Sequence, residues 1–114
     1  MSVSDARVGW LIINGRKVRW ECEVCRSAGP VDLVRIANRQ GLDFSLANRR
    51  PRCRAPGCPG RARFLDASNP WPRSLDTLQT GSAPYWAYRD QEDARLAALG
   101  WRMVEGRWRP PEKM

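Results

Sequence analysis

The sequence predicts a small α+β fold organised around four cysteines. Three observations support this prediction: the cysteines form two close pairs, short strand-like runs flank both pairs, and helical patterns lie between and after them. A chain of 114 residues has the size of one modest domain with a limited core. A bound metal ion would therefore add stability that the core alone does not supply.

The two cysteine pairs have the spacing of a four-thiolate metal site. Two residues separate Cys22 from Cys25, four separate Cys53 from Cys58, and 27 residues lie between the pairs. Each short loop can place two thiolates on one side of an ion, and folding then brings the loops together. We expect a structural Zn2+ ion held by all four cysteines. Two disulfides or an iron–sulfur cluster are the alternatives.

The segment before the first pair is predicted to form a β-hairpin over residues 8–22. Its first strand is apolar, Asn14-Gly15 is the strongest two-residue hairpin signal, and the return strand ends at Cys22. This register gives one inward-facing group of side chains, namely Leu11, Ile13, Val18 and Trp20.

A helical insert is predicted between the cysteine pairs, over residues 31–40. Gly29-Pro30 reads as a turn before it, and Gly41 ends it. The expected apolar stripe of this helix consists of Leu33, Val34 and Ala37, with Ile36 at its edge. After the second cysteine loop, Phe64-Leu65 predicts a strand.

The C-terminal part of the chain differs from the cysteine module in composition. Prolines and aromatic residues in 67–89 predict an irregular connector that its aromatic side chains hold against the body. Residues 90–99 predict a helix whose first turn is acidic, and 101–109 predicts a hairpin around Glu105-Gly106 that places Met103 opposite Trp108. We therefore divide the chain into a cysteine module (1–66), a connector (67–89) and a helix with a hairpin (90–114), the last packed on the first.

The pattern from Cys22 to Phe64, somewhat over a third of the chain, resembles a known group of small zinc modules. A strand ends in C-x2-C, a helical insert follows, and Arg-x-Arg-Cys leads to a last cysteine and a strand. This order is similar to the zinc-ribbon and treble-clef group, mostly to uncharacterised bacterial or phage-borne members. The resemblance implies a structural metal and a scaffold that binds nucleic acid or protein, and it implies no reaction.

Basic charge is concentrated on the cysteine module. The whole chain carries a formal charge of +8, and residues 1–66 account for +7 of it. Six arginines bracket the second cysteine pair, in a stretch without an acid: Arg49, Arg50, Arg52, Arg54, Arg61 and Arg63. A rigid arginine-rich loop suits phosphate contacts, so we expect these six to bind DNA or RNA. Alternatively, some of them compensate the negative charge of a zinc–thiolate site.

The six tryptophans divide into two groups. Trp20, Trp101 and Trp108 fall on strand positions that are predicted to face inward. Trp71 and Trp86 lie in irregular segments, which we expect them to clamp to the body; the alternatives are that they stack on bases or anchor a partner.

The composition argues against catalysis. The chain contains no histidine, which removes His-based nucleophile systems, His–metal nuclease sites and the usual general base. We expect a non-enzymatic, cytoplasmic zinc protein with no small-molecule substrate and no membrane association, because neither a signal peptide nor a spanning stretch is evident. The expected role is nucleic-acid binding, as a transcriptional regulator or mobile-element accessory factor. The alternative is a protein–protein adaptor that uses exposed Trp and Arg.

Overall fold

A computed structural model describes residues 6–77 and 81–111, and predictions that fall on 1–5, 78–80 and 112–114 lie outside these residues. The predicted class, a small α+β fold, is confirmed. The elements of the described chain are α1 (Val8–Ile13), β1 (Val18–Cys22), β2 (Ala28–Pro30), α2 (Leu33–Gln40), β3 (Ala62–Asp66), β4 (Arg73–Ser74), α3 (Ala83–Ala98), β5 (Arg102–Val104) and β6 (Arg107–Arg109).

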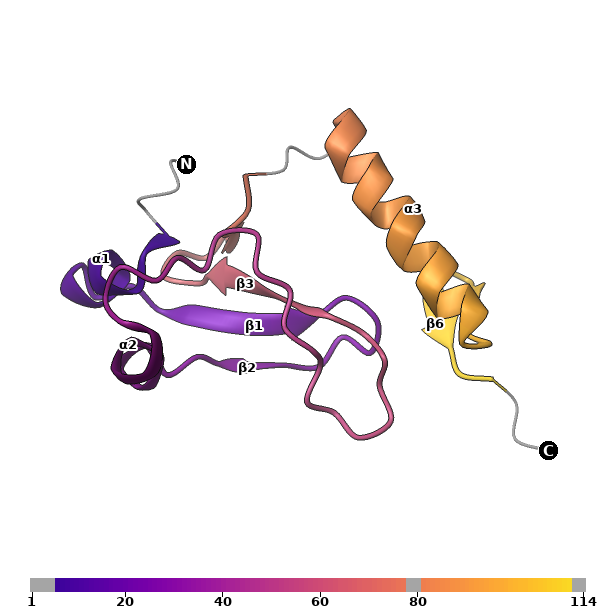
Figure 1. Cartoon of the computed structure of the whole chain (residues 1–114), viewed down its shortest axis with the longest axis horizontal. Coiled ribbons are helices and arrows are strands. Elements are labelled where there is room, and N and C mark those ends of the chain that lie inside the picture. Colours follow the sequence, from indigo (N-terminus) through magenta and orange to yellow (C-terminus); the bar gives the residue numbers. More distant parts are fainter. Residues whose placement is uncertain (1–5, 78–80, 112–114) are drawn as a thin grey trace.

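An antiparallel sheet with the strand order β2-β1-β3-β4 forms the centre of the molecule. The chain measures 50 × 31 × 27 Å, with α1 and α2 toward one end and α3 with the β5-β6 hairpin toward the other (Figure 1). The strand predicted at Phe64-Leu65 is confirmed as β3. The C-terminal hairpin is confirmed as well, with Met103 opposite Trp108.

The predicted N-terminal hairpin is wrong, because its first strand is the helix α1. Val8 and Leu11, which are three residues apart, are fully buried on one side of this helix, whereas Ile13 is 85% exposed. The backbone N–H groups of Val8 and Gly9 donate to the carbonyl oxygens of Phe44 and Leu42. Tertiary contacts thus satisfy donors that the first turn of a helix leaves free.

The insert helix is confirmed as α2, with a different apolar face. Asp32 caps it, since its side chain accepts a hydrogen bond from the Arg35 N–H. Leu33 is buried, and Ile36 and Ala37 pack against the same core. Val34, which was predicted in the stripe, is 57% exposed.

The turn predicted at Gly29-Pro30 is instead part of the edge strand β2. Gly29 lies opposite Trp20, and Pro30 lies opposite Arg19. An edge strand tolerates proline because the missing N–H need not face a neighbouring strand.

Helix α3 begins earlier than predicted. It starts at Ala83, where Ser82 caps it by accepting a hydrogen bond from the Tyr85 N–H, and Pro84 stands in its first turn. The prediction that Asp90, Glu92 and Asp93 occupy the first turn is therefore wrong, because they lie in the middle of the helix. None of the described helices is long and apolar enough to cross a bilayer.

Two groups of buried side chains stabilise this arrangement. The larger group joins α1, β1, α2 and the chain around Leu46 and Leu75, both of which are 1% exposed. The smaller group consists of Cys22, Val24 and Leu96, with Trp101 and Trp108 packed against it. The C-terminal helix and hairpin therefore pack on the cysteine loops.

Candidate metal centre and arginine groove

The sheet brings the two cysteine loops together. Cys22 is the last residue of β1 and pairs with Ala62, the first residue of β3. The second loop folds back on itself before β3, since the Cys53 N–H donates to the carbonyl oxygen of Gly60. In the first loop, the Cys22 N–H donates to the carbonyl oxygen of Ser27. Both cysteine loops thus lie at the same end of the β1-β3 pair, where Cys22 is opposite Ala62.

All four sulfur atoms meet at this point. The Sγ atoms of Cys22, Cys25, Cys53 and Cys58 lie within 4.8 Å of one another. Sγ of Cys22 is 3.7 Å from that of Cys58, and Sγ of Cys25 is 3.6 Å from that of Cys53. All four cysteines are free, so the predicted alternative of two disulfides is not what the chain forms.

The sulfur separations fit a single tetrahedral ion. Four thiolates around one ion at about 2.3 Å stand about 3.8 Å apart, close to both measured distances. An iron–sulfur cluster instead holds several irons and sulfides between its thiolates, and sulfur atoms this close leave no room for them. The donor set therefore fits a metal ion such as Zn2+.

Backbone N–H groups donate to three of the sulfur atoms. Two residues after each of Cys22, Cys53 and Cys58, the N–H lies 3.3–3.4 Å from Sγ. Such bonds stabilise a thiolate, the form that binds metal. With four thiolate ligands the coordination sphere would be complete, which is typical of structural rather than catalytic zinc.

The thiols differ in acidity. Partial burial opposes ionisation of Cys25, but hydrogen bonds from the side chain and backbone of Ser27 outweigh it and lower the pKa of Cys25 to about 6. Burial raises the pKa of Cys53 and raises that of Cys58 to about 12, the latter with a contribution from the neighbouring Cys22. Cys25 therefore ionises most readily of these three.

Gly60 allows the loops to approach each other. A Cβ atom at this position would lie 2.7 Å from Sγ of Cys22 and 2.8 Å from two side-chain atoms of Val24. These separations are too short for real contacts, so a side chain larger than hydrogen would push the cysteine loops apart.

The six arginines predicted to bind nucleic acid separate into two sets. Arg50, Arg61 and Arg63 form ion pairs with carboxylates, as described next. Arg49, Arg52 and Arg54 are exposed. The structure thus does not bring all six to one surface.

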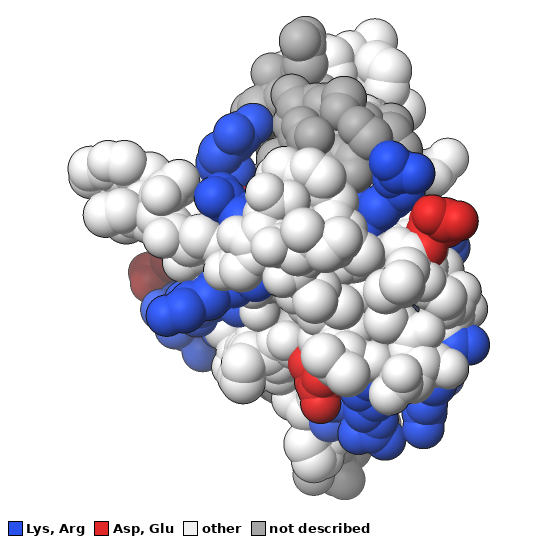
Figure 2. All heavy atoms as spheres, turned by 90° about the vertical axis from the view of Figure 1, so that its left-hand side faces the viewer, with Lys and Arg blue, Asp and Glu red and all other residues white. Residues whose placement is uncertain are grey.

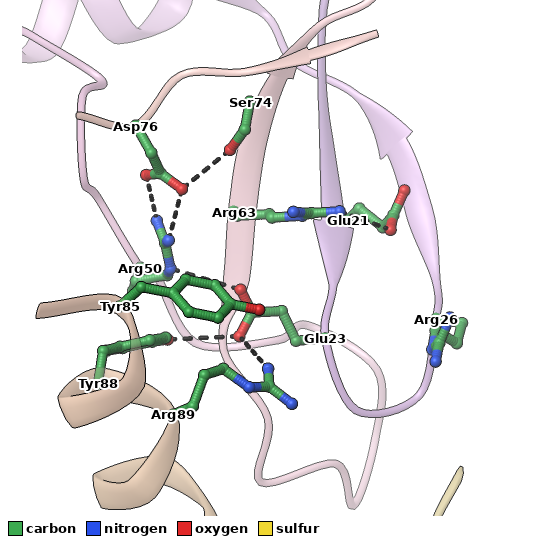
Figure 3. Close-up of a pocket in the computed structure, with 10 residues that line it drawn as sticks. All are labelled: Glu21, Glu23, Arg26, Arg50, Arg63, Ser74, Asp76, Tyr85, Tyr88 and Arg89. Carbon is green, nitrogen blue, oxygen red and sulfur yellow. Dashed lines mark hydrogen bonds and ion pairs between the residues drawn. The ribbon is translucent and has the colours of Figure 1, made fainter. Parts of the chain in front are cut away.

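Arg50 is the centre of an ion-pair network on one face of the sheet (Figure 3). Its guanidinium donates two hydrogen bonds to Asp76, of 2.7 and 2.6 Å, and its Nε lies 3.5 Å from Glu23. The side chains of Arg50 and Asp76 are only 14% and 11% exposed. Asp76 keeps Arg50 charged, since its hydrogen bonds and charge raise the pKa of Arg50 although burial opposes this.

The same network holds α3 against the sheet. Tyr88 OH donates to Glu23 at 3.4 Å, Arg89 lies 3.7 Å from Glu23, and the Arg50 guanidinium lies 5.2 Å from the centroid of the Tyr88 ring. These side chains line a polar hollow of about 240 Å³ between α3 and the sheet (Figure 3). Arg50, Arg63 and Arg89 are each paired with an acid there, so we interpret the hollow as the contact that holds α3 in place.

Arg61 and Arg63 also have acidic partners. Arg61 Nε lies 3.6 Å from Glu92 of α3, and Arg63 lies 3.5 Å from Glu21 on the neighbouring strand. Arg63 belongs to the same face of the sheet as the Arg50 network, because its cross-strand partner Glu21 lines that hollow.

The opposite face of the sheet carries a groove between α2 and the second cysteine loop. Two adjoining hollows, of about 210 and 450 Å³, share Ile36, Pro51 and Phe64. We call them together the arginine groove. Its floor is mainly apolar, with Trp20, Ile36, Phe44, Pro51 and Phe64. Its rim is basic, with Arg35, Arg39, Arg49, Arg52 and Arg54. Arg50 also reaches the larger hollow, but Asp76 and Glu23 engage its guanidinium.

The rim arginines have no acidic partner in the described part of the chain. Among the described residues, no carboxylate lies within ion-pair distance of any of the five. Asp32 is the one acid among the described residues that line the arginine groove, and it caps α2. On the end of the molecule formed by α1 and α2, basic side chains lie around a largely uncharged centre (Figure 2).

Sequence reasoning missed part of the arginine groove. Arg35 and Arg39 were not among the predicted binding residues, although their spacing of four residues on a predicted helix places them on one face. Trp20 was predicted to be inward-facing, but it is only partly buried and lines the groove. The pairing of Trp20 with Phe64 across β1 and β3 depends on strand register, which the sequence did not specify.

Comparisons with protein-family models, with curated proteins and with solved structures find no match to this chain. The resemblance to zinc-ribbon proteins therefore stands on the four-cysteine cluster alone.

Proposed function

We propose that this chain is a non-enzymatic zinc-binding protein that contacts nucleic acid through the arginine groove. The observation that carries the proposal is a row of five arginines, without carboxylate partners among the described residues, along one groove. Arginine suits this role because its planar fork pairs with phosphate oxygens in two-point geometry. Arg50, Arg61 and Arg63 are left out of the proposed contact because acids already engage them.

Zinc would act as a structural part of this surface. Arg52 and Arg54 flank Cys53, and Arg49 lies four residues before it, so the position of the second cysteine loop sets the position of three rim arginines. A full set of thiolate ligands leaves no open coordination site for a reacting water. The chain also contains no histidine to serve as a general base. Both facts support binding rather than catalysis.

The proposed metal is tested by native mass spectrometry of the purified chain. We expect one zinc ion per chain, lost when Cys22 is changed to Ser. Cooperative unfolding should be lost with it, because structural zinc supplies folding free energy in small domains. A metal-free wild-type chain that unfolds with the same cooperativity would contradict this part of the proposal.

Salt-dependent binding tests the nucleic-acid contact. A variant with Arg49, Arg52 and Arg54 changed to Gln should bind short DNA or RNA strands more weakly. The slope of log K against log salt should fall by up to about 2, since each lost phosphate contact removes about 0.7 for a single strand. Fluorescence anisotropy at several salt concentrations gives both values.

A matched control separates the arginine groove from net charge. The variant with Arg19, Arg107 and Arg109 changed to Gln loses the same number of charges at exposed positions outside the groove. The proposal requires this control to bind nearly as well as the wild type. Equal losses in both variants would reduce the contact to unspecific charge attraction, and no binding by the wild type would refute it.

A protein partner is the second candidate, favoured by two exposed tryptophans. Trp71 is 84% and Trp86 is 56% exposed, and large exposed aromatic side chains are typical anchors of protein interfaces. Partners that remain bound after nuclease treatment and are lost in the variant Trp71→Ser with Trp86→Ser would favour this candidate.

A further inference from the structure

The floor of the arginine groove contains two aromatic side chains on neighbouring strands. Trp20 of β1 and Phe64 of β3 are directly opposite each other in the antiparallel register, so both side chains leave the sheet on the same face. Both are only partly buried, and both line the groove. Together they form an aromatic platform, a name that we keep for this pair.

Gly29 lets Trp20 extend across the sheet. It pairs with Trp20 on the other side of β1, and a Cβ atom there would lie 2.9 Å from Nε1 of the indole. The indole therefore occupies the space that a side chain on β2 would fill. The aromatic platform thus begins above β2 and continues to β3.

The rim places positive charge on both sides of the platform. Arg35 comes from α2, whereas Arg52 and Arg54 come from the second cysteine loop, and all three line the same hollow as Trp20 and Phe64. The hollow continues past Phe64 to Arg39 and Arg49. Arg49 itself lies over the ring of Phe44, with its guanidinium carbon 4.4 Å from the ring centroid. An apolar floor between cationic edges matches a strand that carries flat bases and phosphates.

We propose that the arginine groove selects single-stranded nucleic acid, with unpaired bases stacked on Trp20 and Phe64 and phosphates bound by the rim arginines. This inference rests on the proposed function and specifies its ligand. In a duplex, the faces of the bases are covered by their stacked neighbours, so a duplex contacts only the rim. Stacking of bases on aromatic side chains accepts any base sequence, because every base has a π-face.

Three probes of the same length test the inference with the intact, zinc-loaded chain. The first is a fluorescein-labelled DNA strand of sixteen nucleotides without self-complementarity, the second is its duplex, and the third is an abasic strand with the same number of phosphates. We expect the base-containing strand to bind at least about tenfold more tightly than the abasic strand, because one or two of its bases can stack on the aromatic platform. The duplex, whose bases cannot stack on the platform, should bind more weakly than the base-containing strand.

Variants of the aromatic platform locate the contact. Trp20→Leu and Phe64→Leu should each reduce the affinity for the base-containing strand by about tenfold, with little effect on the abasic strand. Trp20→Phe should retain most of the affinity, because it keeps an aromatic face. Trp71→Leu is the matched control, since it removes an exposed tryptophan outside the groove.

Loss of folding is separated from loss of stacking by a direct readout. In the wild type labelled with 19F-tryptophan, the Trp20 resonance, assigned by its absence in Trp20→Phe, should shift on addition of the base-containing strand and not of the abasic strand. A resonance unmoved by the saturating strand would overturn the inference, whatever the Leu variants do.

The outcomes also separate this inference from the proposed function. Equal affinity for the base-containing strand, the abasic strand and the duplex, all weakened by the rim variant, would refute single-strand selection and leave the phosphate contact intact. Failure of all three probes to bind would refute both.

Discussion

Asp76 fixes the orientation of the Arg50 side chain, which lies shortly before the second cysteine pair. Arg50 donates two hydrogen bonds to it, and Ser74 donates a third at 2.9 Å. Burial alone would raise the pKa of Asp76, but these hydrogen bonds and the charge of Arg50 outweigh burial and lower it. We therefore expect the charged pair to contribute to folding.

The lowered pKa of Asp76 predicts how stability depends on pH. Because the pKa in the folded chain is below the ordinary value of about 3.9, the carboxylate contributes stability fully above that value. The contribution is lost as the pH falls through the folded pKa. Asp66, whose pKa is lowered by hydrogen bonds from Ser68 and Arg16 against the effect of burial, acts in the same direction.

The variant Asp76→Asn tests this dependence. At pH 7 the free energy of unfolding should fall by about 2–4 kcal/mol, because the largely buried Arg50 loses its closest carboxylate and keeps only the longer contact with Glu23. Urea unfolding curves should then show a smaller loss of stability between pH 5 and pH 3 than in the wild type. Asp90→Asn on the exposed surface of α3 is the control, and a pH dependence unchanged in Asp76→Asn would contradict the assignment.

Gly60 gives a second prediction at the scale of one residue. Gly60→Ala places a methyl group against Sγ of Cys22 and the side chain of Val24, which should cost about 1–3 kcal/mol of overpacking. The strain falls on the sulfur cluster, so zinc affinity in competition with a chromophoric chelator should drop about tenfold or more. The neighbouring change Pro59→Ala should have little effect, and an unchanged affinity in Gly60→Ala would show that the loops need not approach so closely.

Helix α3 depends on one buried contact with the cysteine loops. Leu96 is 2% exposed and packs with Cys22 and Val24, whereas Leu99 is 52% exposed. Leu96→Ala should therefore destabilise the chain by about 2–4 kcal/mol in urea unfolding, and Leu99→Ala by much less. Equal effects of the two substitutions would mean that α3 is not held by this contact.

The element that sequence reasoning misread most is α1. An apolar run of six residues is compatible with a strand or a buried helix, and Asn14-Gly15 serves either as a hairpin turn or as a helix end. Here Gly15 has φ +60°, and its N–H donates to the carbonyl oxygen of Ile12, which ends the helix. The decision depends on hydrogen bonds to Leu42 and Phe44, which the local sequence cannot show.

The start of α3 was also predicted wrongly, because of Pro84. It was interpreted as a breaker, but proline fits the first turn of a helix, where its missing N–H has no partner in any case. The Ser82 cap two residues earlier was the signal for the true start.

The candidate site was predictable where it depends on spacing along the chain. The cysteine pairs are such a case, because each loop fixes its own two ligands and the strands only join them. The arginines are the opposite case. Whether Arg50 or Arg52 is available depends on Asp76 and Glu23, which are far away in the sequence and reach Arg50 only in the folded chain.

At the scale of the whole molecule, the two faces of the sheet carry different groups of side chains. One face carries ion pairs that hold α3, and the other carries the aromatic platform and the arginine groove. The cysteine cluster joins both, because Cys22 packs with Leu96 of α3 and Cys53 lies between two rim arginines. A metal ion at this point would therefore stabilise both faces at once.

Zinc K-edge X-ray absorption on the purified chain tests the central claim most directly, since it counts and identifies the atoms bound to the metal. We predict one zinc ion per chain with four sulfur neighbours at about 2.3 Å, and three sulfurs with one oxygen or nitrogen after Cys25→Ser. A first coordination shell of the wild type that contains oxygen or nitrogen, or metal–metal scattering of a cluster, would contradict this claim.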